Sequence, residues 1–460
     1  MKTIKTNQRL GMDKNILIIG AGPTGLGAGH RLKELGYKNW RIIEKNAYAG
    51  GLASSFVDNQ GYTWDVGGHV IFSHYKRFDR FVEQALGSDY LEHLRESWIR
   101  ILDRWIPYPF QNNIRHLPRQ ALYECLTGLY EASQNNSGNP ENFKDWILSV
   151  FGPGVAEYFM SPYNKKVWAT PLEKMSKDWI AERVSVVDFR RVLENVVLGK
   201  DDVSWGPNNK FIFPLKGGTG EIFRNIAKSF NDHIDYGLSI EWIDAEKRML
   251  GLSEGRVMEY DRLISTMPLD VLVSKIRNRP EKVAQAASLL VANKGLVVGV
   301  GFERSDPATK CWMYFPENKT PCYRVTHFSN YSHNNVPDIN RNFSLMAEIS
   351  YPHDHSVDKE AAVEQTIQGF INTGLINAED RNLIKTVYTI DIDYSYPVPT
   401  LERDKALGII QPWMEGKEIY SRGRFGAWKY EVGNMDHSVV QGMEVVDKAL
   451  NSIPEKVYWG

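Results

Sequence analysis

Clustered cysteines, long hydrophobic runs and an excess of one charge are all missing from this sequence of 460 residues. The three cysteines, Cys125, Cys311 and Cys322, fit neither a disulfide framework nor a zinc-binding spacing, so we expect reduced thiols and no metal site. The formal net charge of −1 argues against a nucleic-acid binder, so cations that bind phosphate must be local. Residues 1–13 carry no signal-peptide core and no apolar run has the length of a membrane span, which predicts a cytoplasmic protein without a membrane partner.

Internal repeats, low-complexity tracts and flexible linkers are missing as well. A chain of this length is too long for one small core and suits two or three units. Because no linker separates them, we expect these units to interleave. Aromatic residues make up 12% of the chain, which is consistent with an aromatic-lined pocket and equally with a large core.

The first ordered segment has the pattern of a βαβ unit. Residues 15–19 are predominantly apolar, which is typical of a buried parallel strand. A glycine-rich turn and a helix to about Leu35 follow, and Gly36 is expected to close the helix. Residues 40–43 then predict a second strand, which ends at Glu44.

The turn inside this unit carries a dinucleotide-binding fingerprint. Gly20, Gly22 and Gly25 form a G-x-G-x-x-G pattern between strand and helix, and the acid Glu44 ends the next strand. In this pattern Gly20 permits the tight turn, Gly22 the approach of a pyrophosphate and Gly25 the close packing of helix on strand. The helix N-terminus favours the pyrophosphate, and Glu44 can accept hydrogen bonds from ribose hydroxyls. The alternative is a glycine-rich turn that binds no ligand.

Later segments favour FAD over NAD as the ligand of this fingerprint. They are residues 50–54, 67–69, 216–220, 265–268 and 423–426. This series resembles the FAD-containing amine-oxidase-like superfamily, in which such segments wrap the isoalloxazine. A helix from about Asp436 is expected to pack back on the first unit and to direct its positive end at the flavin N1–C2=O edge.

Two further regions have patterns of their own. Residues 113–200 show helical spacing of apolar positions and few strand signals, which predicts a helical insertion. Its helices are expected over residues 117–132, 143–151 and 186–198. Mixed structure then returns, with strands over 210–213, 239–243 and 262–265. An antiparallel sheet is expected from strands over 295–302, 310–315, 323–329, 343–349 and 386–392.

These patterns predict an α/β protein with three parts: a Rossmann-like FAD-binding domain, an inserted helical domain that binds substrate, and an antiparallel β-sheet domain. The FAD-binding domain is expected to be discontinuous because its glycine-rich segments are spread along the chain. The predicted ranges are 14–96 with 214–290 and 401–460 for the FAD-binding domain, 112–204 for the helical domain, and 97–111 with 205–213 and 291–400 for the sheet domain.

A series of longer stretches carries a sharper resemblance. The first is D-V-G-G-H-V-I-F-S at 65–73, and the last is G-R-F-G-A-W-K-Y-E-V-G-N at 423–434. Between them lie residues 105–113, 162–169, 182–184, 205–208, 311–316, 323–324, 328–332 and 396–403. In this order, from about residue 14 to 450, the chain resembles the UDP-galactopyranose mutases, particularly the eukaryotic-type branch.

The resemblance implies an isomerase that interconverts UDP-galactopyranose and UDP-galactofuranose. In that reaction N5 of reduced FAD attacks the anomeric carbon, displaces UDP and forms a covalent adduct, so the flavin undergoes no net redox change. The cofactor must first be reduced, and the resemblance implies NADPH as the donor. Because no second G-x-G-x-x-G is visible, NADPH would share the substrate cleft. The oligomeric state is not implied.

The resemblance also assigns residues to the substrate. Arg183 and Arg324 match diphosphate-binding arginines, whose forks can pair phosphate oxygens as charge develops on the leaving group. The alternative for either arginine is a structural ion pair. Tyr108, Phe110 and Gln111 match the uracil-binding segment, for which a turn around two prolines is the alternative. The other matches are Asn164, Trp168 (equally a core residue), Asn208, Trp312, Tyr314, Tyr396 and Tyr430.

Beside the flavin, His69 matches the family's histidine loop, where it is expected to position or tune the cofactor and not to act as a strict general base. With Arg183 and Arg324 it makes up the expected catalytic set. Met435 stands where close fungal relatives carry glutamine, a departure that affects one hydrogen bond to the flavin. Besides the fingerprint glycines and Glu44, the expected cofactor contacts are Gly51, Leu52, Gly68, Arg424, Asn434 and Met435.

Three alternatives stay open at this point. A mutase for another nucleotide sugar, such as an N-acetylated or 6-deoxy galactose, is one, because the sequence specifies the uridine better than the sugar hydroxyls. A flavin oxidase of the same superfamily would share the FAD segments but not the diphosphate-binding set. A catalytically silent nucleotide-sugar binder is the third, and the full set of matched site residues argues against it.

Overall fold

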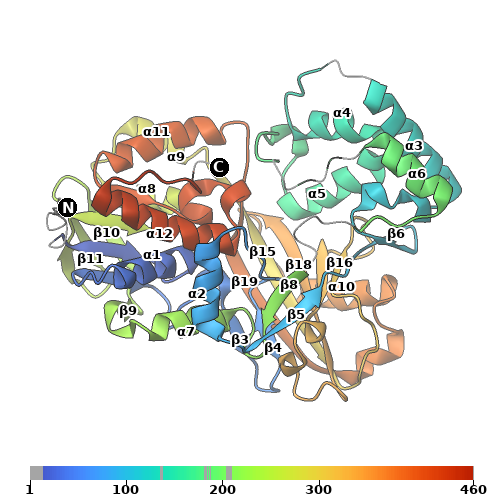
Figure 1. The fold of residues 1–460 in the computed structure, drawn as a ribbon, viewed down its shortest axis with the longest axis horizontal. Helices are drawn as coiled ribbons and strands as arrows, with labels where there is room; N and C mark the ends of the chain where they lie inside the picture. Colours follow the sequence, from blue (N-terminus) through green and yellow to red (C-terminus); the bar gives the residue numbers. More distant parts are fainter. Residues whose placement is uncertain are drawn as a thin grey trace, which may run out of the picture.

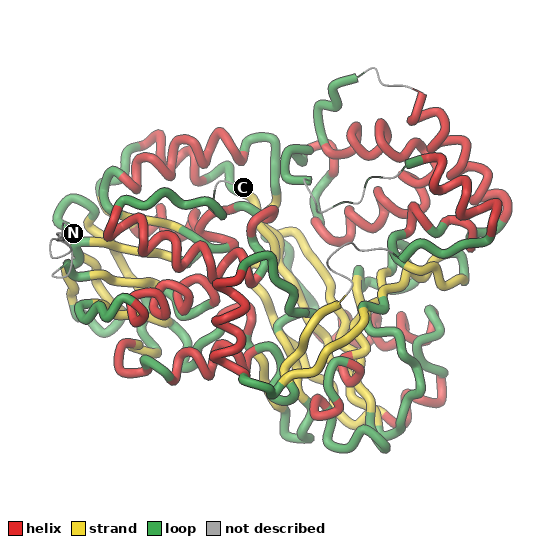
Figure 2. Tube along the Cα trace, in the orientation of Figure 1, coloured by secondary structure: helices red, strands yellow, loops and turns green. Residues whose placement is uncertain are grey.

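The computed structural model describes residues 14–134, 138–180, Val184, Val186, 188–203 and 210–458. A five-stranded and a seven-stranded sheet form the body of the molecule, and a helical unit stands apart at the upper right (Figure 1, Figure 2). The predicted fold class, α/β with a Rossmann-like part, a helical part and a second sheet, is confirmed.

The five-stranded sheet is parallel and brings together distant parts of the chain. Its elements are β1 (Ile16–Ile19), α1 (Pro23–Glu34), β2 (Trp40–Glu44), β9 (Ile234–Tyr236), β13 (Arg262–Ser265), β20 (Ile419–Ser421) and α12 (Met435–Asn451). The strand order is β20-β13-β1-β2-β9, and all neighbours run parallel. The apolar run of β1 is buried near the centre, as predicted. The predicted tail helix is α12, which lies against α1 (Figure 1).

Alternate side chains of β1 point to opposite faces of this sheet, and different layers cover the two faces. One layer contains α2 (Lys76–Leu86) and α7 (Gly220–Lys228) beside α1 and α12. The other contains β10 (Ile240–Asp244), β11 (Met249–Leu252), β12 (Val257–Glu259), α8 (Leu269–Lys275), β14 (Ile276–Arg277), α9 (Glu281–Ala287) and α11 (Arg403–Glu415). Ile16 and Ile18 pack into the first layer, whereas Leu17 and Ile19 pack into the second.

The seven-stranded sheet is the central element of the second half of the molecule. It consists of β6 (Ser97–Ile101), β7 (Arg104–Pro107), β15 (Val291–Phe302), β16 (Trp312–Tyr314), β17 (Arg324–His327), β18 (Phe343–Pro352) and β19 (Ile384–Val398), in the order β19-β15-β18-β17-β16-β6-β7. The helix α10 (Lys359–Asn372) packs on one face of it. The five strands predicted between residues 295 and 392 are confirmed.

One prediction about this sheet is wrong: it is not antiparallel throughout. Strands β6 and β16 run parallel, with Trp98 opposite Met313. The physical reason is the long crossover between them, since parallel neighbours require an extended connection. That crossover carries the helical unit and part of the five-stranded sheet, so the two strands reach the same sheet from separate passes of the chain.

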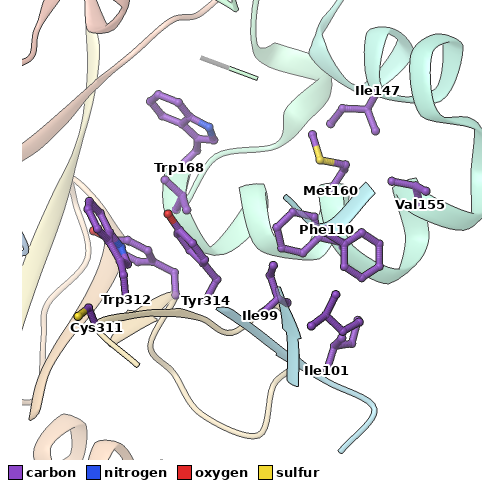
Figure 3. Close-up of a cluster of buried hydrophobic side chains, with 14 of the residues drawn as sticks. Ile99, Ile101, Phe110, Ile147, Val155, Met160, Trp168, Cys311, Trp312 and Tyr314 are labelled. Carbon is purple, nitrogen blue, oxygen red and sulfur yellow. The ribbon is translucent and has the colours of Figure 1, made fainter. Parts of the chain in front are cut away.

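The helical unit contains α3 (Arg119–Gln134), α4 (Phe143–Val155), α5 (Ser161–Trp168) and α6 (Phe189–Leu198). Three of these helices were predicted from the apolar spacing. The helix α4 begins where the Asn142 side chain accepts a hydrogen bond from the Asp145 N–H, at 3.0 Å. Apolar side chains of the unit, such as Ile147 and Met160, face those of β6 in one buried cluster (Figure 3).

Short strand pairs and the C-terminal segment complete the fold. The pairs are β3 (Ser55–Val57) with β4 (Thr63–Asp65), and β5 (Tyr90–Leu94) with β8 (Lys210–Pro214). After α12 the chain turns back, and Glu455 forms a bidentate ion pair with Arg422, with both N–O distances 2.6 Å. Both side chains are fully buried. The backbone N–H groups of Lys456 and Val457 donate to Glu444, which fixes this segment against α12.

The predicted domain ranges stay a prediction, although the alternation of the chain between the sheets is in keeping with them. Within the described ranges, we find no helix with the length and apolar character needed to cross a membrane.

Candidate active site

The dinucleotide fingerprint forms a tight cradle between β1 and α1. Gly20 has φ of +96°, a conformation that L side chains rarely adopt. A Cβ on Gly25 would lie 1.8 Å from the Gly20 carbonyl oxygen, so the predicted close packing of helix on strand requires glycine there. Gly22 approaches the backbone of Gly51, with 3.8 Å from its ideal Cβ to the Gly51 Cα. The cradle therefore leaves its backbone N–H groups at the helix N-terminus open to an anion.

Glu44 closes the cradle from the end of β2. Its buried carboxylate accepts hydrogen bonds from the Ala21 N–H at 2.7 Å and from the Asn46 N–H at 2.8 Å. Burial raises the pKa of this carboxyl, and the two N–H donors offset part of the rise. These residues fit the ADP half of FAD, because a carboxylate acceptor stands beside a glycine turn and a helix N-terminus.

A large cavity of about 1160 Å³ opens near the cradle and is bordered by the start of α12 with the loops around it, by the seven-stranded sheet and by the helical unit. That volume exceeds the usual range for a single small ligand. Its walls include most residues predicted to bind cofactor or substrate. These are Leu52, Gly68, His69, Tyr108, Gln111, Asn164, Trp168, Trp312, Tyr314, Arg324, Tyr396, Arg424, Tyr430, Asn434 and Met435.

One described residue predicted to bind substrate does not line these walls. Phe110 is fully buried (Figure 3), and its ring stacks on that of Phe159, with 4.8 Å between the ring centroids. Phe110 thus supports the wall from behind, beside the neighbouring Gln111, which lines the cavity. Arg183 and Asn208 lie outside the described residues.

The wall formed by β17 and β18 carries a buried ion pair. Arg324 and Glu348 are cross-strand partners, and their side chains form two N–O contacts of 2.6 Å. Glu348 also accepts from the Tyr323 hydroxyl at 2.9 Å and from the Gly68 N–H at 3.0 Å. Burial alone would raise the pKa of the Glu348 carboxyl, but Arg324, the Gly68 N–H and the Tyr323 hydroxyl together hold that pKa below its usual range. An arginine is thereby held, charged and oriented, at the cavity wall.

Sequence reasoning missed Glu348, although a signal was present. The acid stands in the apolar run of β18, and a buried carboxylate requires a cationic or donor partner. Arg95 was missed as well. It also lines the cavity, with its guanidinium carbon 5.0 Å from the Trp312 ring centre, while that of Arg324 is 4.7 Å away.

Four aromatic rings join the three parts of the molecule at this cavity. Trp168 ends α5, Trp179 follows it, Tyr396 belongs to β19, and Tyr430 precedes α12. Their rings meet edge to face, with Trp168 4.9 Å from Tyr430 and Trp179 5.5 Å from Tyr430 between centroids. The Trp168 indole N–H donates to the Asn164 side chain at 3.2 Å. Trp168 is therefore both a core residue and a cavity residue, and Trp179 was not foreseen.

His69 lies on the cavity wall in the segment that follows Gly68. Among the described residues, no hydrogen-bond partner reaches its buried Nδ1. Burial lowers the pKa of this imidazole to about 4, with a further contribution from Arg424 that Glu348 partly offsets. The side chain is therefore neutral at pH 7.

This shift predicts a pH dependence of stability. The folded pKa of His69 lies below its unfolded value, so the unfolded state takes up the proton first, and stability is lost as pH falls from about 6.5 toward 4. Between pH 7 and pH 5, proton uptake by His69 on unfolding lowers the free energy of unfolding of the wild type by about 2 kcal/mol. We expect His69→Gln to lack this decrease. Urea unfolding of both proteins at the two pH values measures the difference. The prediction fails if the variant loses as much stability on acidification as the wild type, with exposed His333→Gln as the control.

Comparison with known proteins places these features in a family. The chain matches the flavin containing amine oxidoreductase family over residues 23–433. The chain belongs to this family. A solved structure of reduced UDP-galactopyranose mutase is 42% identical, with 97% of this chain and 95% of that chain covered and a TM-score of 0.93. This similarity groups the flavoprotein with the UDP-galactopyranose mutase branch of the family.

More distant relatives share the fold alone. A putative protoporphyrinogen oxidase from Exiguobacterium sp. is 14% identical, with a TM-score of 0.72 and coverage of 96% of this chain and 99% of that chain. A putrescine oxidase variant is 15% identical, with a TM-score of 0.67 and coverage of 95% and 98%. The flavoprotein therefore shares its overall fold with these relatives.

Proposed function

We propose that this flavoprotein interconverts UDP-galactopyranose and UDP-galactofuranose with reduced FAD, through a covalent bond between flavin N5 and the sugar. The observation that carries the proposal is the Arg324–Glu348 pair, which presents a fixed guanidinium beside Tyr396 in a cavity of this size. A diphosphate leaving group requires such a donor. The 42% identity to UDP-galactopyranose mutase over 97% of the chain supports the same substrate.

The chain's own residues divide the work in this proposal. Arg324, Tyr396 and Tyr430 hold the diphosphate, joined by Arg183 on the strength of the resemblance. Tyr108 and Gln111 face the cavity and bind the uracil by stacking and by an amide edge. Asn164, Trp168, Asn208, Trp312 and Tyr314 bind the remainder of the substrate.

On the cofactor side, the cradle glycines with Glu44, Gly51 and Leu52 hold the ADP half, while Gly68, Arg424, Asn434 and Met435 surround the flavin. When bound and reduced, FAD supplies the nucleophile for the anomeric carbon. The neutral His69 offers a polar contact there without adding charge. Arg424 is braced by a hydrogen bond from its Nε to the Gly433 carbonyl at 2.9 Å, so its charge remains available to offset that of the cofactor.

A paired turnover assay tests the proposal. Purified protein is incubated with UDP-galactofuranose, with and without dithionite, and the nucleotide sugars are separated by chromatography. We expect UDP-galactopyranose in the reduced sample alone, without stoichiometric consumption of reductant. No conversion by protein with bound, reducible FAD would reject this substrate, and N-acetylated or 6-deoxy sugars would then be tested. Turnover that consumes oxygen or reductant in proportion to product would instead identify an oxidase or dehydrogenase.

We further propose NADPH as the physiological reductant, bound in the same cavity. Stopped-flow mixing of NADPH with the oxidised protein is expected to bleach the flavin absorbance, and UDP is expected to slow this step by competing for the cavity. An unchanged oxidised spectrum would remove NADPH from the proposal. Action in the cytoplasm stays a prediction.

A further inference from the structure

One cluster of titratable side chains on the cavity wall has no part in the proposed reaction. Asp436, the second residue of α12, is buried and accepts from the Nδ1 of His74 at 2.8 Å and from the Nδ1 of His437 at 2.9 Å. The backbone N–H groups of His437 and His74 also donate to it, at 2.8 and 3.3 Å. All three residues line the cavity. We refer to them as the His-Asp-His unit.

The carboxylate of this unit is held in its ionised form. Burial alone would raise the pKa of Asp436, but the hydrogen bonds and charges of His437 and His74 lower it to about 2. An ionised carboxylate only accepts hydrogen bonds, so both Nδ1 atoms must be donors. The Nε2 atom of each imidazole is therefore the ring nitrogen that remains for a further proton.

The unit also fixes the segment that carries His69. This segment is held at its start by the Gly68 N–H donating to Glu348, and at its end by the His74 N–H and Nδ1 donating to Asp436. Between these ends, the backbones of Ile71 and Ile212 exchange hydrogen bonds of 3.2 and 2.9 Å. Loss of Asp436 would release the anchor at the end of the segment and leave the other two.

We propose that Asp436 is a positioning residue for the flavin, and that the charge of the His-Asp-His unit sets how the FAD reduction potential depends on pH. The inference rests on the proposed function for the placement of the flavin ring at the start of α12. It goes beyond that function because the proposed reaction assigns the unit no role. With both imidazoles neutral the unit carries a charge of −1, and with one imidazole protonated it carries none.

The charge matters because reduction adds negative charge to the cofactor. Two electrons and one proton convert FAD to FADH⁻, and a second proton gives FADH₂. A protonated imidazole in the unit favours FADH⁻, and an unprotonated unit with its bare carboxylate opposes it. Because reduction then draws a proton to the unit, the midpoint potential falls more steeply with pH than the roughly 30 mV per unit of a two-electron, one-proton couple. Other charged or titratable groups facing this wall are His69, Tyr75, Arg424, Glu431 and Lys456.

The test is the midpoint potential of the bound FAD in the holoenzyme, measured against reference dyes from pH 5.5 to 8.5. Asp436→Asn removes the carboxylate and with it the means of holding an imidazolium. We expect its potential to match the wild type at pH 5.5 and to lie higher at pH 8.5, by about a tenfold shift in the reduced-to-oxidised ratio, or roughly 30 mV. His74→Gln and His437→Gln each report on one imidazole and are expected to flatten the same curve in part.

Asp447→Asn is the matched control, since Asp447 is a buried aspartate of α12 paired with Arg31 and Arg77 away from the cavity. It is expected to leave the curve unchanged. Hydrogen exchange should also rise in residues 68–74 of Asp436→Asn and not of Asp447→Asn. Potentials that follow the wild-type curve in Asp436→Asn and in both histidine variants would overturn the inference. An enzyme that shows the predicted curves but no mutase turnover would reject the proposed function and retain the role of the unit.

Discussion

Arg324→Ala is expected to lower kcat/KM for UDP-galactofuranose by about 10³-fold, which corresponds to about 4 kcal/mol of transition-state stabilisation. Two effects combine in this loss. The leaving diphosphate loses its fixed donor, and Glu348 is left buried with its pair broken. Arg324→Lys restores the charge but not the bidentate contact with Glu348. We therefore expect it to recover less than a tenth of the kcat/KM that Arg324→Ala loses.

The control for this prediction is a second arginine that forms a bidentate ion pair, just after a strand of the same sheet. Arg304, after β15, pairs with Asp380 through contacts of 2.8 and 3.0 Å and does not line the cavity. Arg304→Ala is expected to change kcat/KM less than tenfold when both variants bind FAD stoichiometrically. If Arg324→Ala also stayed within tenfold of the wild type, other groups would have to stabilise the leaving diphosphate.

Glu455→Ala is expected to lower the free energy of unfolding by about 3 kcal/mol, because it leaves Arg422 charged and fully buried with only one of its two carboxylate partners. The segment around Glu455 also forms part of the cavity wall through Lys456 and Val457. FAD should therefore dissociate at a lower denaturant concentration than in the wild type. Urea titrations followed by flavin fluorescence and by circular dichroism measure both effects.

An ion pair near the surface gives the comparison for Glu455→Ala. Arg41 contacts Asp235 at 2.8 Å, but 41% of the arginine side chain is exposed. Solvent screens such a pair, so Asp235→Ala should cost less than about 1 kcal/mol. Equal losses in the two variants would show that desolvation of Arg422 and Glu455 cancels their attraction, as happens in some buried pairs.

The parts of the fold that could be predicted are those whose signals are local. The apolar run of β1, the glycines of the first turn and the helical spacing around α4 each depend on residues close in sequence, and each element is present. The parallel pairing of β6 with β16 was missed because it depends on which strand lies beside which after 200 residues of intervening chain. No local pattern carries that information.

The candidate site shows the same division. Residues within recognisable stretches, such as His69, Arg324 and Tyr396, line the same cavity. Phe110 stands in such a stretch, yet it turns into the core, because it begins the short 3₁₀-helix Phe110–Asn112, in which successive side chains point about 120° apart. Glu348 and Asp436 were missed since their importance comes from partners far away in the sequence, Arg324 and His74 among them.

The connectivity of the five-stranded sheet has a consequence for how the protein is made. Strand β1 carries the first cradle residues, but its neighbour β13 follows more than 200 residues later, and β20 and α12 come later still. During synthesis, the sheet around the cradle therefore stays incomplete until nearly all of the chain has left the ribosome. We expect FAD to bind only after α12 has been synthesised. We expect a chain truncated before residue 419 to bind no flavin. The yellow colour of bound flavin in a preparation would then come from full-length chains alone.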